Sequence, residues 1–132
     1  MSALMDFLIE NSSEDITEKV IISERLKGKP FTIRAMSSNS YSEYQQAATI
    51  IKKGKKVNFN ERMFNQSVVL NHCIEPNFKD AELIKKAGCV TPAQLLEKVL
   101  RAGEISTLTR KIMELSGFMQ DLDEVEEDAK NS

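Results

Sequence analysis

The N-terminal part of the chain has a hydrophobic pattern of period two. Apolar and polar residues alternate over residues 19–26, with two exceptions, and again over 31–35, while residues 27–30 between them have the chemistry of a turn. This pattern predicts an antiparallel β-hairpin over residues 19–36. Because a two-stranded hairpin is marginally stable in water, we expect it to pack on helices or to pair with another strand edge, which is a first indication of self-association.

From residue 37 onward the apolar residues recur at intervals of three and four, which predicts helices and no further strand. The helix near residues 59–74 is apolar over more than half of its circumference, so we expect it at the centre of the fold. Thr91 followed by Pro92 is typical of a helix start, and Gly117 of a helix end. The helices predicted within residues 40–118 cover 41–53, 59–74, 79–87, 92–100 and 105–116.

The two ends of the chain differ from its middle in charge. Residues 1–18 carry five acids and no base, and residues 119–132 carry six acids and one base, whereas residues 19–118 carry 17 bases and nine acids, a formal charge of +8. We expect the first segment to be a short helix or flexible, the last to be a disordered tail, and residues 19–118 to form a single globular domain. The predicted fold class is α+β, mostly α-helical, with one N-terminal antiparallel β-hairpin.

Few side chains are suited to catalysis or metal binding. Cys73 and Cys89 do not form a CxxC motif, and with His72 they supply three ligands where structural zinc takes four. Neighbouring residues in a helix point about 100° apart, so His72 and Cys73 are not placed as a nucleophile and its base. No glycine-rich phosphate loop is present, and paired carboxylates lie mainly in the acidic tail. We therefore expect no catalytic residue, cofactor or metal, and we assign these side chains to packing.

The chain gives no sign of export or membrane insertion. No stretch long enough to span a bilayer is free of charge, and no basic segment precedes the first apolar run. We expect a cytosolic protein without a membrane partner.

A small DNA-binding regulator is an alternative interpretation. Residues 82–101 have the spacing of a helix-turn-helix, and residues 52–56 add a lysine-rich segment that is more typical of a solvated loop. Against this interpretation, a sequence pI near 5.5 is low for a DNA-binding domain. The alternative would gain support if the basic side chains of this region clustered on one exposed face; these are Lys85, Lys86, Lys98 and Arg101.

The stretch from residue 91 to residue 118 carries a family resemblance. It reads TPAQLLEKVLRAGEISTLTRKIMELSGF. Its Pro-x-x-Leu-Leu helix, the Ala-Gly-Glu step at 102–104 and the Leu-Ser-Gly-Phe ending at 115–118 resemble the XkdN-like tail assembly chaperones of phages and defective prophages of Gram-positive bacteria. The order of the preceding segments agrees, so the resemblance covers residues 3–118.

The resemblance implies a non-enzymatic role in the cytoplasm of a bacterial host. Such chaperones hold the long, helical tape measure protein in solution until tail tube subunits polymerise around it, and they are absent from the finished virion. In many such phages a frameshifted, longer form recruits the tail tube protein. The implied partners are therefore the tape measure protein, the tail tube protein and other copies of the chain, and neither nucleic acid nor a membrane.

The candidate partner-binding residues follow from exposed apolar helix faces, since a holdase must offer such faces to an amphipathic client helix. Their alternative role is the intramolecular core, which is the favoured interpretation for the last helix. The N-terminal set belongs to a short, weak helix and is more open to partners. The candidates are Leu4, Phe7, Leu8, Leu108, Ile112, Leu115 and Phe118.

Overall fold

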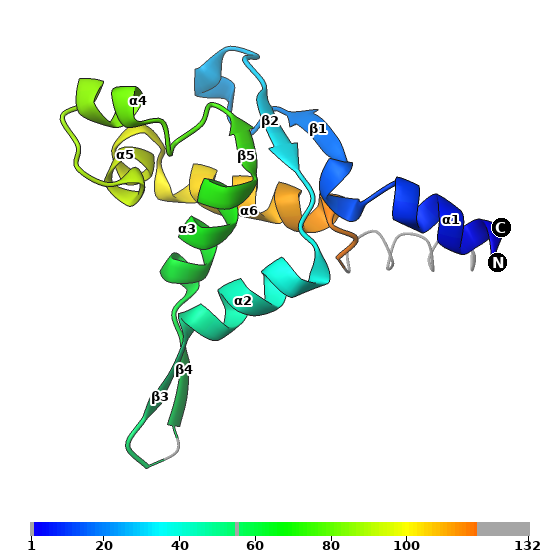
Figure 1. Ribbon diagram of the computed structural model, residues 1–132. Helices are drawn as coiled ribbons and strands as arrows, with labels where there is room; N and C mark the ends of the chain where they lie inside the picture. Colours follow the sequence, from blue (N-terminus) through cyan, green and yellow to red (C-terminus); the bar gives the residue numbers. More distant parts are fainter. Residues whose placement is uncertain (1, 55, 119–132) are drawn as a thin grey trace, which may run out of the picture.

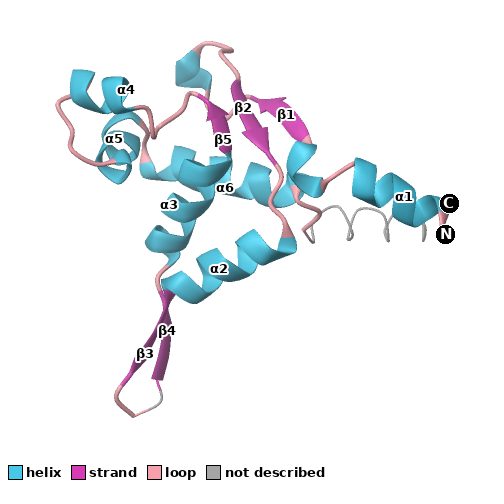
Figure 2. Ribbon diagram, viewed as in Figure 1, coloured by secondary structure: helices cyan, strands magenta, loops and turns pink. Residues whose placement is uncertain are grey.

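The computed structural model describes residues 2–54 and 56–118 as a mixed assembly of helices and strands (Figures 1 and 2). The helices are α1 (Ala3–Glu10), α2 (Ser38–Ala48), α3 (Glu61–His72), α4 (Ala81–Lys86), α5 (Pro92–Val99) and α6 (Ala102–Leu115). The strands are β1 (Thr17–Val20), β2 (Phe31–Arg34), β3 (Thr49–Lys52), β4 (Lys56–Phe59) and β5 (Cys73–Glu75). The α+β fold class is confirmed at this level, and the predicted acidic tail, residues 119–132, lies outside the described residues.

A three-stranded antiparallel sheet forms one layer of the fold. Its order is β1-β2-β5, with Val20 opposite Phe31 and Ile33 opposite Cys73. All four of these side chains are buried, because alternate positions of a strand face the same side and here that side meets α3 and α6. β5 therefore provides the additional strand edge that the N-terminal hairpin requires.

The predicted hairpin is confirmed for its pairing and wrong for the length of its first strand. β1 and β2 pair antiparallel, but β1 ends at Val20, and residues 21–30 form a loop with a short 3₁₀ turn at Glu24–Leu26. The left-handed backbone at Lys27 and Gly28, with φ of 52° and 75°, closes that turn. The loop carries Arg25 towards α6, which an extended strand would not do.

The expectation of helices alone after residue 37 is wrong in two places. β3 and β4 form a second hairpin around Gly54, and β5 follows α3 directly. Thr49, Ile50 and Ile51 are β-branched, and they end α2 at Ala48 because such side chains favour the extended backbone. The described part of the lysine-rich segment, residues 52–54 and 56, therefore lies at the far end of a projecting hairpin (Figure 1).

Helix α3 lies at the centre of the helical layer, as its apolar circumference predicts. It packs against α2, α5, α6 and β5. α5 begins at the predicted Thr91-Pro92 pair with a capping box, in which the Thr91 hydroxyl accepts from the Gln94 N–H and the Gln94 side chain accepts from the Thr91 N–H. The largest fully enclosed apolar side chains among the described residues are Ile33, Val68, Val69, Leu96, Leu108 and Ile112.

Candidate functional site

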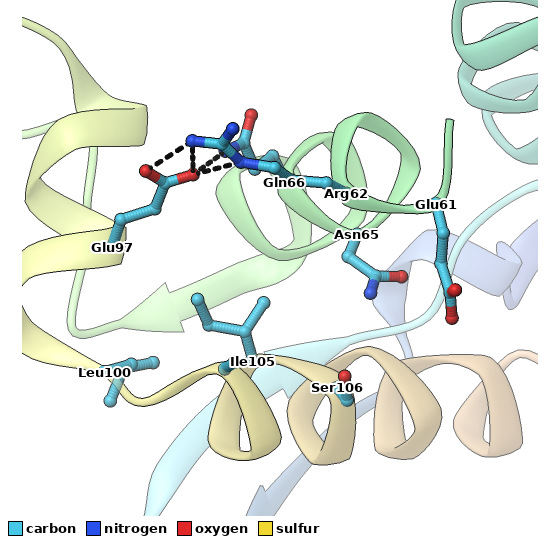
Figure 3. A pocket seen from close by; sticks show the side chains of 9 residues that line it. Glu61, Arg62, Asn65, Gln66, Glu97, Leu100, Ile105 and Ser106 are labelled. Carbon is cyan, nitrogen blue, oxygen red and sulfur yellow. Dashed lines mark hydrogen bonds and ion pairs between the residues drawn. The ribbon is translucent and has the colours of Figure 1, made fainter.

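A surface groove runs between α3 and α6, and we call it the α3–α6 groove. It consists of two adjoining hollows of about 450 and 360 Å³, which share Glu61, Asn65 and Ser106 (Figure 3). The first hollow is closed at one side by α5. Its lining is Glu61, Arg62, Asn65, Gln66, Glu97, Leu100, Ala102, Ile105 and Ser106. The second hollow is lined by Phe59, Glu61, Phe64, Asn65, Ser106, Thr109, Arg110 and Met113.

The groove combines an apolar base with a polar rim. Leu100 and Ile105 lie at the base of the first hollow, and Phe64 and Met113 line the second. Methionine is unbranched and polarisable, so Met113 can adapt to apolar side chains of different shape. Such a surface is suited to the apolar stripe of a helix rather than to a small polar substrate.

An ion pair joins the α3 and α5 sides of the groove. Arg62 donates from Nε to Oε1 of Glu97 and from Nη2 to Oε2, both at 2.7 Å, and the Gln66 amide also donates to Glu97 (Figure 3). Both charged side chains are solvated, so the pair stabilises the fold by at most about 1 kcal/mol. Its main effect is to hold the α3 and α5 sides of the groove together above Leu100.

The N-terminus of α6 is held by a buried carboxylate. Glu104 accepts from Arg25 Nε at 2.7 Å and from Arg25 Nη2 at 2.6 Å, and it also accepts from the Arg101 N–H at 2.7 Å. These donors, above all the Arg25 guanidinium, hold the pKa of Glu104 well below its usual range. Since these donors converge on one buried carboxylate, the cluster positions the wall of the groove and has the character of a structural anchor.

His72 and Cys73 are buried beside each other at the end of α3, and their surroundings indicate a structural role. The His72 Nε2 atom lies 2.8 Å from the Tyr44 hydroxyl, and burial, with a further contribution from the Arg34 guanidinium, lowers the His72 pKa to about 4. Burial also raises the pKa of the Cys73 thiol to about 12, so this thiol is unreactive at neutral pH. Among residues 2–54 and 56–118, His, Cys, Asp and Glu side chains form no group of three that could hold a metal.

The structure separates the two predicted sets of partner-binding residues. Leu108 and Ile112 are fully buried, as the core interpretation of the last helix predicts, so they present no surface to a partner. Leu115 and Phe118 are partly buried against the core, and the Phe118 ring lies 4.6 Å from that of Tyr41.

The N-terminal set is placed differently. Leu4, Phe7 and Leu8 are 66, 61 and 52% exposed on α1, which projects from the body (Figure 1). The sequence interpretation missed the apolar side chains of the second hairpin and the α3–α6 groove. The β-branched run at residues 49–51 was the signal for the hairpin, whereas the groove has no local signal because three helices build it.

Two of the four basic residues proposed for DNA binding make contacts within the chain. The Lys98 ammonium donates to the Ala87 carbonyl, and Arg101 donates to Ser23 and Glu104. In the described part of the chain, nothing favours the helix-turn-helix alternative over residues 82–101. Within residues 2–54 and 56–118, none of the helices has the length and apolar character needed to span a bilayer.

Comparison with known proteins assigns the chain to a family. Residues 4–130 match the phage XkdN-like tail assembly chaperone proteins. The chain belongs to this family. The resemblance seen in residues 91–118 is thereby confirmed, and a phage tail assembly chaperone agrees with an apolar groove more directly than a DNA-binding regulator does.

Two relatives of this tail assembly chaperone occur in Bacillus subtilis (strain 168). The phage-like element PBSX protein XkdN is 27% identical over 123 residues, covering 86% of this chain and 83% of its own. The protein YqbN is 28% identical over 123 residues with the same coverage. A crystal structure of YqbN superimposes with a TM-score of 0.67 at 22% identity, covering 90% of this chain and 99% of that one, which shows a shared fold.

Proposed function

We propose that this tail assembly chaperone binds the tape measure protein and keeps it soluble until tail tube subunits polymerise around it. Family membership over nearly the whole chain carries the proposal. In this account the protein works by binding, acts in the cytoplasm of the bacterial host and is left out of the mature virion. The tail tube protein is a second partner, which a longer frameshifted form of the chaperone would recruit.

The α3–α6 groove is the client site that the geometry supports best. Ile105 and Met113 lie eight residues apart on α6, about 12 Å, so a client helix laid along the groove would place apolar side chains about two turns apart over them, in the helix-in-groove mode. The rim offers charges of both signs, Arg62 and Arg110 opposite Glu61 and Glu97, which suits the polar flanks of an amphipathic helix.

Apolar contact in an open groove suits a chaperone because it is reversible and tolerant of sequence. Each client side chain that leaves water gains about 1.5–3 kcal/mol at most, so several weak contacts hold the client without trapping it. The acidic terminal segments, residues 1–18 and 119–132, would keep the complex in solution.

Co-expression with the tape measure protein of the same phage, followed by pull-down, tests the proposal. Ser106 is exposed and borders both hollows, so Ser106→Arg should fill the groove without disturbing the core, and Ser106→Ala is the matched control. We expect the wild type and Ser106→Ala to hold the client in solution and Ser106→Arg to lose at least about tenfold in affinity. An insoluble, unbound client with the wild type would overturn the proposed function, and equal binding by all three would overturn the groove as its site.

A further inference from the structure

Besides the groove, the described residues carry two further apolar surfaces, and the first is helix α1. Every residue of α1 is exposed, although five of its eight side chains are large and apolar. Leu4, Phe7 and Leu8 are three and four residues apart and form one stripe, and the carboxylate residue Glu10 lies next to this stripe on the helix. A short helix is only marginally stable when it is surrounded by water, so a helix with this composition is suited to docking on another surface.

The second surface is one face of the β3–β4 hairpin. Ile51 pairs with Val57 and Thr49 pairs with Phe59, so these four side chains share a face. Ile51, Val57 and Phe59 are 76, 64 and 49% exposed. At the base of this face lies a hollow of about 400 Å³, lined by Gln45, Gln46, Thr49, Ile51 and Phe59. An isolated two-stranded hairpin is marginally stable, so this face gains stability from a covering partner.

The two surfaces match in charge and in length. Residues 1–18 carry five acids and no base, whereas the hairpin segment, residues 49–59, carries four lysines and no acid. Lys53 and Lys56 are exposed near its tip. Eight helical residues span about 12 Å and four strand residues about 13 Å, so the α1 stripe can cover the whole apolar face of the hairpin.

Figure 1 shows α1 and the hairpin projecting from different sides of the body, so they lie apart within one chain. We propose that α1 of one copy docks on the β3–β4 hairpin of a second copy, with the α1 stripe against the apolar face of the hairpin. The Phe7 ring is the side chain whose size suits the hollow beside Ile51.

Docking of α1 on a hairpin joins two different surfaces, so an open chain of copies keeps one free α1 at one end and one free hairpin at the other. Such head-to-tail contacts produce rings or open chains rather than closed dimers. One helix on one hairpin is a small interface, and we therefore expect weak association that depends on protein concentration. This inference stands apart from the proposed function, because Phe59 is the single residue that the proposed docking face shares with the lining of the α3–α6 groove.

Sedimentation velocity on the full chain over a wide range of concentrations tests the inference. We expect the mean mass of the wild type to rise with concentration. Phe7→Ser should remove the α1 contact, and the double variant Ile51→Thr, Val57→Thr should remove the hairpin contact while keeping β-branched strand residues. Each should weaken association at least about tenfold, since one large apolar side chain is worth that much. Val90→Ser is the matched control, because Val90 is an exposed apolar residue, 83% exposed, that lies on neither surface.

The decisive experiment mixes the two variants, each of which lacks one of the two contact surfaces. The Phe7→Ser protein keeps an intact hairpin and the double variant keeps an intact α1, so their mixture should form a dimer although each alone stays monomeric. Circular dichroism of each variant confirms that the monomer is folded. A monomeric wild type at every concentration, a monomeric mixture, or a hairpin variant that still associates through α1 alone would overturn the inference. A charge reversal at Lys56→Glu should weaken association, and adding Glu10→Lys to the same chain should restore part of it.

Discussion

Arg25 and Glu104 lie 79 positions apart in the chain and form a two-pronged ion pair. Arg25 donates from Nε and Nη2 to the two carboxylate oxygens at 2.7 and 2.6 Å, and Arg25 Nη2 also donates to the Val99 carbonyl at 2.9 Å. The pair joins the loop after β1 to the first turn of α6. It therefore fixes the sheet and the groove wall relative to each other.

Breaking this pair should destabilise the fold. In Glu104→Gln the side chain keeps its shape but loses its charge, so Arg25 loses a paired acceptor and the Arg101 N–H loses a strong one. We expect a melting temperature lower by several degrees, measured by thermal unfolding. The matched control is Arg62→Gln in the exposed pair with Glu97, which should change the free energy of unfolding by less than about 1 kcal/mol. Equal effects of the two changes would contradict the anchoring role of Glu104.

His72 should make the stability of the protein depend on pH. It is 1% exposed, and burial, followed by the charge of Arg34, lowers its pKa from 6.5 to about 4. The charges of the other two neighbours have smaller effects: Glu14 raises the pKa and Lys79 lowers it. Because the unfolded chain binds this proton more tightly, the stabilisation is complete above about pH 6.5 and is lost as pH falls towards 4. The loss should reach roughly 3 kcal/mol.

Urea unfolding at several pH values measures this effect, with His72→Gln as the comparison. The variant removes the titrating group and keeps a polar atom near the Tyr44 hydroxyl. We expect its stability to vary less than that of the wild type between pH 6.5 and pH 4. If both proteins lost stability in parallel across that range, His72 would not be the responsible group.

The two sets of apolar candidates should respond differently to truncation. Leu108 is fully enclosed, so Leu108→Ala leaves a cavity and should cost about 2–5 kcal/mol of unfolding free energy. Leu4 is exposed on α1, so Leu4→Ala should change the free energy of unfolding by less than about 0.5 kcal/mol. Denaturant unfolding of both variants at low protein concentration checks the contrast. A neutral Leu108→Ala would mean that α6 is not part of the core.

Local signals predicted the parts of the fold that depend on neighbouring residues. The alternation around Phe31 and Ile33 was sufficient for the β1–β2 pair, and Thr91-Pro92 was sufficient for the start of α5. Ile51 was misassigned because it continues the helical spacing of α2 while belonging to a β-branched run, so two local preferences compete there.

The candidate site depended on contacts that no local pattern contains. The buried state of Glu104 follows from Arg25, far away in the sequence, and an isolated glutamate in a helix gives no sign of it. The groove brings together Gln66, Leu100 and Ser106 from three separate segments of the chain, so its shape arises from packing. The sequence analysis named Leu108 and Ile112 as candidates but favoured the core over a partner surface for the last helix, and their burial agrees with the core interpretation.

The most direct test of the central claim is the aggregation of the tape measure protein in the presence of this chaperone. Unfolded tape measure protein is diluted into buffer with increasing amounts of the wild-type chain, and light scattering is followed over time. We predict that scattering falls in proportion to added chaperone until the number of chaperone grooves equals the number of client segments that bind them. The two proteins should then elute together. Undiminished aggregation at every ratio, with the chaperone eluting alone, would contradict the account.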